Sequence, residues 1–202
     1  MSENARKLGF VTITQVQPSG LKFKVQGGKI YDPTQRLTVP QLYLNSLGVE
    51  GETEGGERLL DIHHADHPDT HNNGTNAISI GFTSHYKIMR ERFGEHMVDG
   101  TGGENIIIES KEEIWLSDLG NKVEFHNPDT GDIVSLDVVK IAAPCDPFSH
   151  FAADSQDQRL PADELKEILQ FLGKGRRGFL LALSADQKTG FIQSGDMVYA
   201  IS

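Results

Sequence analysis

The chain of 202 residues has a single cysteine, and this scarcity limits its chemistry. One thiol excludes a disulfide within the chain, which is typical of a protein of the reducing cytoplasm. Positive charge is also scarce, because 19 Lys and Arg stand against 29 Asp and Glu, for a formal net charge of -10. Affinity for phosphate backbones depends on Lys and Arg, so this balance argues against binding of a nucleic acid polymer.

Long hydrophobic segments are lacking as well. No run of about 18 apolar residues occurs, so we expect no membrane-spanning helix. The first ten residues, MSENARKLGF, contain no apolar segment typical of a secretory signal, which adds to the expectation of a cytoplasmic protein. No stretch rich in Pro, Gly or Ser divides the chain. We therefore expect a single domain over residues 1–202, with its core within about 10–201.

Short apolar runs between Gly, Pro, Asn and Asp predict a mainly β protein. Residues 10–13 and 21–25 are interpreted as a hairpin, the second strand with clear period-2 alternation. Further strands are predicted over residues 105–109, 133–141, 179–183 and 197–201.

Two segments have helical periodicity. In residues 84–93, Tyr86, Met89 and Phe93 fall on one face. Residues 162–172 carry acidic side chains in the first turn and have apolar residues at i, i+3, i+4 and i+7: Leu165, Ile168, Leu169 and Leu172. Both are interpreted as packing helices that cover a closed or nearly closed β-barrel.

Residues 48–76 are predicted to form a long polar loop, either functional or flexible. Its middle is rich in groups that bind metals: His63, His64, His67, His71, Asp61, Asp66 and Asp69. A histidine and a carboxylate can bind zinc or iron. However, the spacing has no HExxH pattern and no helical period, so it favours a solvated loop over a dedicated metal site.

Cys145 ends a predicted strand and is followed by Asp146 and Pro147. A lone cysteine is most often a small buried hydrophobic residue. At a point where the chain leaves the sheet, however, a thiolate can face a cleft and act as a soft metal ligand or a sulfur nucleophile. Both interpretations stay open on the residues alone.

Two glycine-rich segments are candidates for anion binding. Residues 100–105, GTGGEN, could present backbone N–H groups, but they lead into a strand and lack the lysine of a Walker loop. Turn geometry alone accounts for these glycines. Residues 173–178, GKGRRG, either place favourable cations at a helix C-terminus or hold an oxyanion in an arginine fork. Arg177, beside the next strand, is the better candidate for the second role.

Taken in order, several short motifs resemble the MOSC domain, the module found at the C-terminus of molybdenum cofactor sulfurases. The resemblance covers about residues 10–201. It rests on Leu47-Gly48-Val49-Glu50-Gly51, Ala77-Ile78-Ser79-Ile80, Gly103-Glu104-Asn105, Pro144-Cys145, Leu169-Gln170-Phe171-Leu172, Arg176-Arg177-Gly178-Phe179 and Gly195-Asp196. The sequence departs from the family where an early Gly-Asp is common: here Gly51-Glu52 stands in its place.

The resemblance implies a β-barrel-like fold that binds the molybdenum cofactor (molybdopterin) or carries sulfur for it. By family analogy, Cys145 is the molybdenum ligand or persulfide carrier. Gly103, Glu104 and Asn105 would line the same cleft, and Arg177 would bind the cofactor phosphate. Family members include enzymes that reduce N-hydroxylated compounds, so we expect a small-molecule reductase with separate electron-donor proteins. The alternative is a non-catalytic sulfur carrier or cofactor-binding module.

Overall fold

The structure is a computed structural model that describes residues 5–25, 28–72 and 77–202. Residues 73–76 of the predicted loop, and the first four residues of the predicted domain, lie outside the described residues. None of the helices in the described part of the chain is long and apolar enough to cross a membrane.

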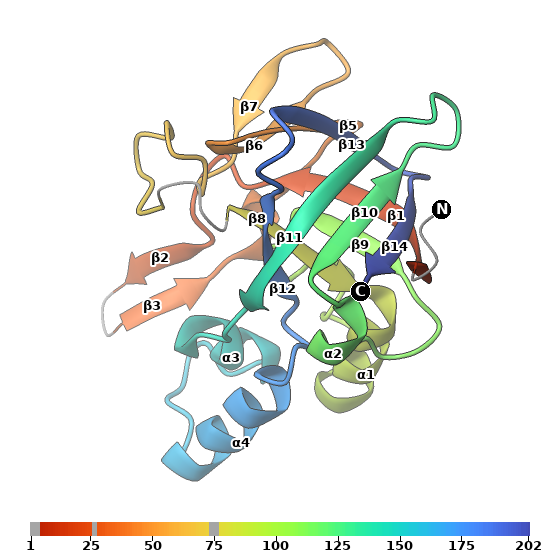
Figure 1. The fold of residues 1–202 in the computed structure, drawn as a ribbon. Coiled ribbons are helices and arrows are strands. Elements are labelled where there is room, and N and C mark those ends of the chain that lie inside the picture. Colours follow the sequence, from red (N-terminus) through yellow and green to blue (C-terminus); the bar gives the residue numbers. More distant parts are fainter. Residues whose placement is uncertain (1–4, 26–27, 73–76) are drawn as a thin grey trace.

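Seven strands of the described chain close into a barrel (Figure 1). They are β1 (Ala5–Val16), β8 (Ile78–Phe82), β9 (Ile106–Glu109), β10 (Lys122–His126), β11 (Ile133–Ile141), β12 (Phe179–Leu183) and β14 (Met197–Ile201). Their order is β14-β10-β11-β12-β8-β9-β1, and β1 pairs again with β14. The β8–β9 pair is parallel. Closure leaves these seven strands without a free edge and confirms the predicted mainly β barrel.

Shorter strands extend this barrel. A second sheet has the order β13-β5-β6-β7, and β2 pairs with β3, while β4 pairs with the end of β1. The bounds are β2 (Lys22–Val25), β3 (Gly28–Tyr31), β4 (Leu37–Thr38), β5 (Gln41–Asn45), β6 (Gly48–Glu52), β7 (Arg58–Leu60) and β13 (Thr189–Gln193).

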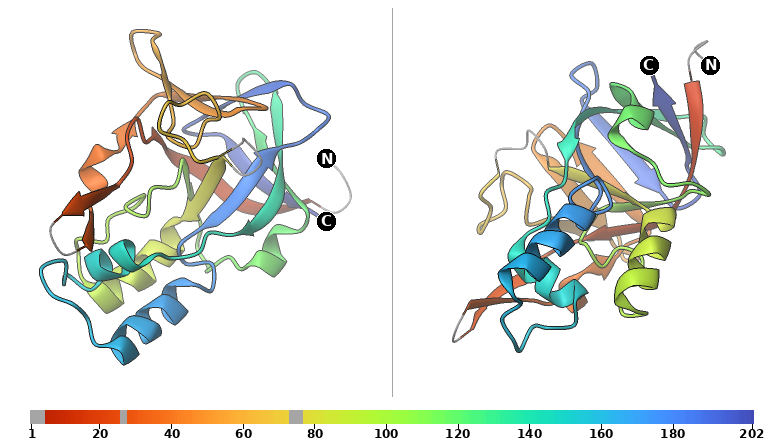
Figure 2. Two further views of the ribbon diagram at one scale, coloured as in Figure 1. Left: turned by 90° about the vertical axis from the view of Figure 1, so that its left-hand side faces the viewer. Right: turned by 90° about the horizontal axis from the view of Figure 1, so that it is seen from below.

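Helices cover one end of the molecule. They are α1 (Thr83–Phe93), α2 (Leu116–Leu119), α3 (Asp146–Ala152) and α4 (Ala162–Leu172), with a 3₁₀ turn at Pro33–Gln35. Figure 2 shows α1, α3 and α4 together at this end. The predicted packing helices over 84–93 and 162–172 are confirmed, because Tyr86, Met89, Ile168 and Leu172 are buried.

Two apolar clusters divide the core. The first joins barrel residues such as Ile80 and Phe179 to residues of the second sheet. The second lies between the barrel and the helices. The run Ile106, Ile107 and Ile108 shows the division: the first and third belong to the barrel cluster, and the middle one belongs to the helix-covered cluster. Successive side chains of a strand point to opposite faces, so β9 is buried on both sides.

Two predictions about the N-terminal half are wrong. Residues 10–13 and 21–25 do not form a hairpin: β1 is long enough to pair with β14, β9 and β4, and β2 pairs with β3. The alternation in β2 did not mark a buried face, because all four of its residues are exposed. The predicted loop over 48–76 contains β6 and β7, which form because Glu50, Gly51 and Glu52 pair with both β5 and β7.

Candidate functional site

A cleft of about 790 Å³ lies against the outer face of the barrel wall. Ser79 of β8 and Leu180 of β12 are partners across the sheet, and both line the cleft. Their neighbours Ile78 and Phe179 belong to the barrel cluster, so the alternation of the strands turns Ser79 and Leu180 outward. Gly103, just before β9, lines the same cleft. We call the outward side of β8, β9 and β12 the outer wall.

Three other segments complete the cleft. Ala142 and Ala143 extend from the end of β11, and Tyr31 comes from β3. The segment 61–72 contributes His63 and His71, and it crosses in front of the barrel in the left view of Figure 2. Residues far apart in the sequence therefore share one hollow.

The outer wall buries an ion pair beside this cleft. The side chain of Glu104 is fully buried, and its Oε1 lies 3.5 Å from Nη1 of Arg177. The Tyr86 hydroxyl donates to Oε2 of Glu104 at 2.6 Å and accepts from the backbone N–H of Gly102 at 2.8 Å. Oε1 of Glu104 has no hydrogen-bond partner among the described residues. Arg177 is 18% exposed and lines the cleft, so its guanidinium joins the buried carboxylate to the open space.

Burial sets the protonation states of this group. It raises the pKa of Tyr86 well above its ordinary value, and the charge of Glu104 adds to the shift, so the phenol keeps its proton. Burial, the largest influence, would lower the pKa of Arg177, but the negative charge of Glu104 and smaller contributions from Tyr31, Tyr86 and Cys145 together outweigh it, so the pKa is raised. The guanidinium therefore stays charged beside the cleft. Its carbon also lies 4.9 Å from the centre of the Phe148 ring, a cation–π contact.

Glycines make room for the buried carboxylate. Gly178 has φ +94°, and a Cβ there would lie 2.4 Å from the carbonyl oxygen of Ile80 and 3.1 Å from Cγ of Glu104. A Cβ at Gly81 would also lie 3.1 Å from Glu104. Other residues at these positions would collide with the wall or displace Glu104.

Asn105 lies behind the cleft wall rather than in its lining. Its side-chain oxygen accepts from both the backbone N–H and the hydroxyl of Ser79, at 3.0 and 2.9 Å. Its amide nitrogen donates to Oδ2 of Asp61 at 3.0 Å. These contacts show Asn105 holding β8, β9 and the segment after β7 together. Its proposed contact with a cofactor stays a prediction.

Cys145 lies at the N-terminus of α3, in the position before the first helical residue, and is half-buried. The chain reaches it from Ala142, whose N–H donates to the carbonyl of Gly178 beside Arg177. Cys145 packs against the helix-covered cluster. Its coulombic contribution to the raised pKa of Arg177 follows those of Glu104, Tyr31 and Tyr86. The thiol is therefore within electrostatic reach of the arginine, although it is not itself part of the cleft lining.

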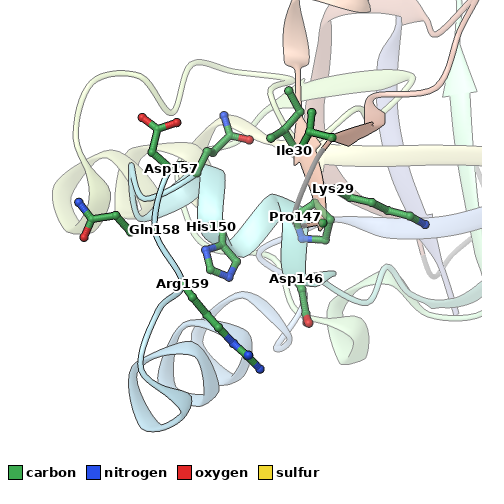
Figure 3. Close-up of a pocket in the computed structure, with 11 residues that line it drawn as sticks. Lys29, Ile30, Asp146, Pro147, His150, Asp157, Gln158 and Arg159 are labelled. Carbon is green, nitrogen blue, oxygen red and sulfur yellow. The ribbon is translucent and has the colours of Figure 1, made fainter.

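A separate groove of about 560 Å³ lies beyond Cys145. Asp146 and Pro147 line it, with Lys29, His150 and Arg159 around it (Figure 3). It shares no lining residue with the cleft, and neither Arg177 nor Gly103 reaches it. Since the cleft brings together two of the five predicted site residues, we take the cleft as the candidate site.

The histidine-rich segment is only partly the solvated loop that its polarity predicts, because Asp66, Asp69 and His71 are exposed but other residues are not. Asp61, His64 and His67 are buried. Nδ1 of His64 accepts from the N–H of Asp66, and Nε2 of His67 lies 3.1 Å from the carbonyl of Pro18. Among the residues that the structure describes, no group of three or more His, Cys, Asp or Glu side chains is placed to hold a metal ion. The buried imidazoles instead fix the course of the chain.

Sequence reasoning missed three contributors to the site. Tyr31 and Tyr86 were interpreted, if at all, as packing residues, and Asp61 was placed in a solvated loop. The spacing Asp61-Ile62-His63 fits a turn in which an aspartate accepts from the backbone two residues on, and this signal was available. Nothing in the sequence shows that this aspartate is buried.

The sequence matches no family model and no curated protein significantly. Solved structures do match. One described only as a hypothetical protein has a TM-score of 0.55 at 14% identity, covering 98% of this chain and 69% of that one. The YuaD protein of Bacillus subtilis has a TM-score of 0.53 at 14% identity, covering 98% and 97%. YiiM of Escherichia coli, a MOSC-domain protein, has a TM-score of 0.51 at 18% identity, covering 82% and 65%. At these identities the likeness shows the fold, which is consistent with a MOSC fold.

Proposed function

We propose that this chain binds the molybdenum cofactor in the cleft, with Cys145 as the molybdenum ligand, and reduces small N-hydroxylated compounds. The observation that supports this most directly is the convergence of Arg177 and Gly103 on one cleft beside Cys145. The likeness to YiiM in fold supports the same family.

The residues of the cleft and Cys145 fit a molybdenum cofactor in size and in chemistry. A cleft of about 790 Å³ is within the usual size range of small-molecule sites, roughly 300–1,000 Å³. The charged guanidinium of Arg177 at its wall suits the phosphate of a pterin cofactor. The thiol of Cys145 is a soft ligand for a metal centre. Oε2 of Glu104 accepts from Tyr86, whereas Oε1 has no hydrogen-bond partner among the described residues and lies 3.5 Å from Arg177, so it supports pairing with the guanidinium.

When bound, the cofactor would supply a metal able to exchange electrons and to offer an open coordination position. Arg177 would bind the phosphate, and Glu104 and Tyr86 would fix its guanidinium. Gly103, with no side chain, would let a ligand approach the backbone closely. Tyr31 would close the side of the cleft that faces Cys145, since both pack in the helix-covered cluster.

The electrons would come from separate donor proteins. The chain has no flavin or iron–sulfur motif, so a reductase built on it needs a partner of that chemistry. We propose a cytoplasmic setting, because the single cysteine is compatible with a reducing compartment.

The test is the molybdenum and pterin content of protein expressed in a host that makes the cofactor. The parent should hold both in near-stoichiometric amounts. Cys145→Ser should lose molybdenum, and His150→Gln, in the separate groove, should retain it. A parent without molybdenum and pterin contradicts the proposal, provided that a known molybdenum enzyme loads in the same host.

A second candidate function is a persulfide carrier that transfers sulfur without catalysis of its own. One observation favours it: Cys145 lies beside the cleft and not in its lining. Intact-mass measurement would show one added sulfur atom on Cys145 in protein that lacks molybdenum. The same added mass on the Cys145→Ser variant would contradict the assignment of the sulfur to Cys145.

A further inference from the structure

Asp61 is a buried carboxylate with four hydrogen-bond contacts. Its Oδ2 accepts from the backbone N–H of Gln17 at 2.9 Å and from the amide of Asn105 at 3.0 Å. Its Oδ1 accepts from the backbone N–H of His63 at 2.9 Å and lies 2.8 Å from Nδ1 of the same residue. Two contacts at each oxygen fill the acceptor positions of an ionised carboxylate. A protonated Asp61 would need an acceptor, and of these four contacts only Nδ1 of His63 could serve as one.

The contact between Asp61 and His63 fixes the imidazole. An ionised carboxylate can only accept, so beside an ionised Asp61 it is Nδ1 of His63 that carries the proton and donates it. Nε2 is then free to exchange a proton with solvent or with a molecule bound in the cleft. The side chain of Asp61 is fully buried, whereas that of His63 is 51% exposed and lines the cleft. An aspartate behind a histidine in this way sets both the ring orientation and the tautomer.

The backbone around this pair is held on several sides. The N–H of Asp61 donates to Val49, and the N–H of Ile62 donates to Gln17, at 3.0 and 2.8 Å. The N–H of Ala65 donates to Leu47 at 2.8 Å. Strands and their ends therefore anchor both sides of His63, as a residue positioned for proton transfer requires.

His63 lines the same cleft as Arg177, the residue proposed to bind the cofactor phosphate. The other charged or titratable residues of the lining are Lys22, Tyr31, Asp69, His71 and Arg177. The second cleft histidine is His71. Among the described residues, the ion pairs of histidines with carboxylates involve His63, His64 and His126, and not His71. His63 alone of the two has a buried partner that selects its tautomer.

We propose that His63 is the proton donor to the substrate in this cleft and that Asp61 is its positioning residue. This assignment rests on the proposed reductase function. The overall reaction is R₂N–OH + 2 e⁻ + 2 H⁺ → R₂N–H + H₂O, with electrons from a reduced flavin or iron–sulfur donor protein. Nε2–H of the His63 imidazolium gives its proton to the oxygen as the N–O bond breaks, and water leaves. The second proton reaches nitrogen from solvent, and the exposed imidazole regains its own proton from solvent.

The first readout is the tautomer of His63, which needs no activity. In ¹⁵N-histidine protein, two-dimensional NMR should show neutral His63 protonated at Nδ1 and unprotonated at Nε2, with the resonance assigned by its loss in His63→Gln. Asp61→Asn should remove this preference. The opposite tautomer in the parent overturns the proposal.

The second readout is the pH profile of the reductase, beside metal content. His63→Gln should keep the molybdenum and pterin of the parent and lower kcat by about 10²-fold or more, the range of general acid catalysis. Its profile should lose one ionisation that His150→Gln, in the separate groove, retains, and added imidazole should restore part of the rate. A loaded His63→Gln with the parental kcat and profile overturns the assignment. A parent without molybdenum contradicts the proposed function itself, and the assignment with it.

Discussion

The interior of the barrel and its outer wall are two sides of the same strands, yet they bury different groups. In β8, Ile78 and Ile80 point into an apolar cluster, whereas Ser79 and Gly81 point outward. The outward side faces the cleft, Glu104 and Asn105. The interior stabilises the fold by removing apolar surface from water, and the outer wall holds charged groups whose burial is costly. The cleft lies on the second side, because apolar side chains fill the first.

The largest expected effect comes from breaking the interior. Phe82 is fully buried and touches Phe179 in an edge-to-face arrangement, so Phe82→Ala leaves a cavity among rigid strands. The free energy of unfolding should fall by about 3–5 kcal/mol in urea titrations. Phe23→Ala, on exposed β2, should change it by less than about 1 kcal/mol. Equal losses of unfolding free energy from the two variants would contradict the view that the barrel interior, and not the exposed strand β2, stabilises the fold.

The next effect concerns the buried pair on the outer wall. Arg177→Met leaves the carboxylate of Glu104 buried with Tyr86 alone, and should cost about 2–4 kcal/mol of unfolding free energy. Arg177→Met combined with Glu104→Gln should recover part of this loss, because a neutral amide needs no counter-charge. Chemical denaturation of the two variants measures the difference. A double variant less stable than Arg177→Met would contradict the role given to the pair.

The rim where α1 meets the barrel gives a pH-dependent effect. Burial lowers the pKa of His85 from 6.5 to about 4. Between these values the unfolded chain binds a proton that the folded chain does not, so stability falls as the pH falls from 6.5 to 4, by up to about 3 kcal/mol. His85→Gln should flatten this part of the stability profile, followed by urea denaturation at each pH. Profiles of equal slope would contradict the assignment of the slope to His85.

The smallest effect comes from an exposed ion pair, the counterpart of Arg177 and Glu104. Arg6 is 51% exposed and pairs with Asp118. Arg6→Ala should change the free energy of unfolding by less than about 1 kcal/mol, and added salt should shrink the difference. A loss as large as that of Arg177→Met would show that burial does not distinguish the two pairs.

The fold was largely predictable because local patterns and tertiary packing agree. The strands predicted over 133–141, 179–183 and 197–201 coincide with β11, β12 and β14, since apolar runs between turn residues define both. The helix over 162–172 coincides with α4 for the same reason. By contrast, α3 was not predicted: a seven-residue helix after Cys145 is too short for its periodicity to stand out.

Residues of the candidate site could be predicted only where their own local sequence marks them as unusual. Gly103 and Arg177 were singled out from their own neighbourhoods, and the structure brings them to one cleft. Asp61 could not be found in this way, because its partners Gln17 and Asn105 each lie 44 residues away in sequence. Burial turned a polar loop residue into the centre of a hydrogen-bond network, and that is a property of the tertiary fold.

The most direct test of the central claim, that the outer wall carries a molybdenum site ligated by Cys145, is X-ray absorption at the molybdenum edge on loaded protein. The parent should show one sulfur ligand more than Cys145→Ser loaded to a measurable level, or Cys145→Ser should hold no molybdenum. The same sulfur count in parent and variant, at equal molybdenum content, would contradict the claim.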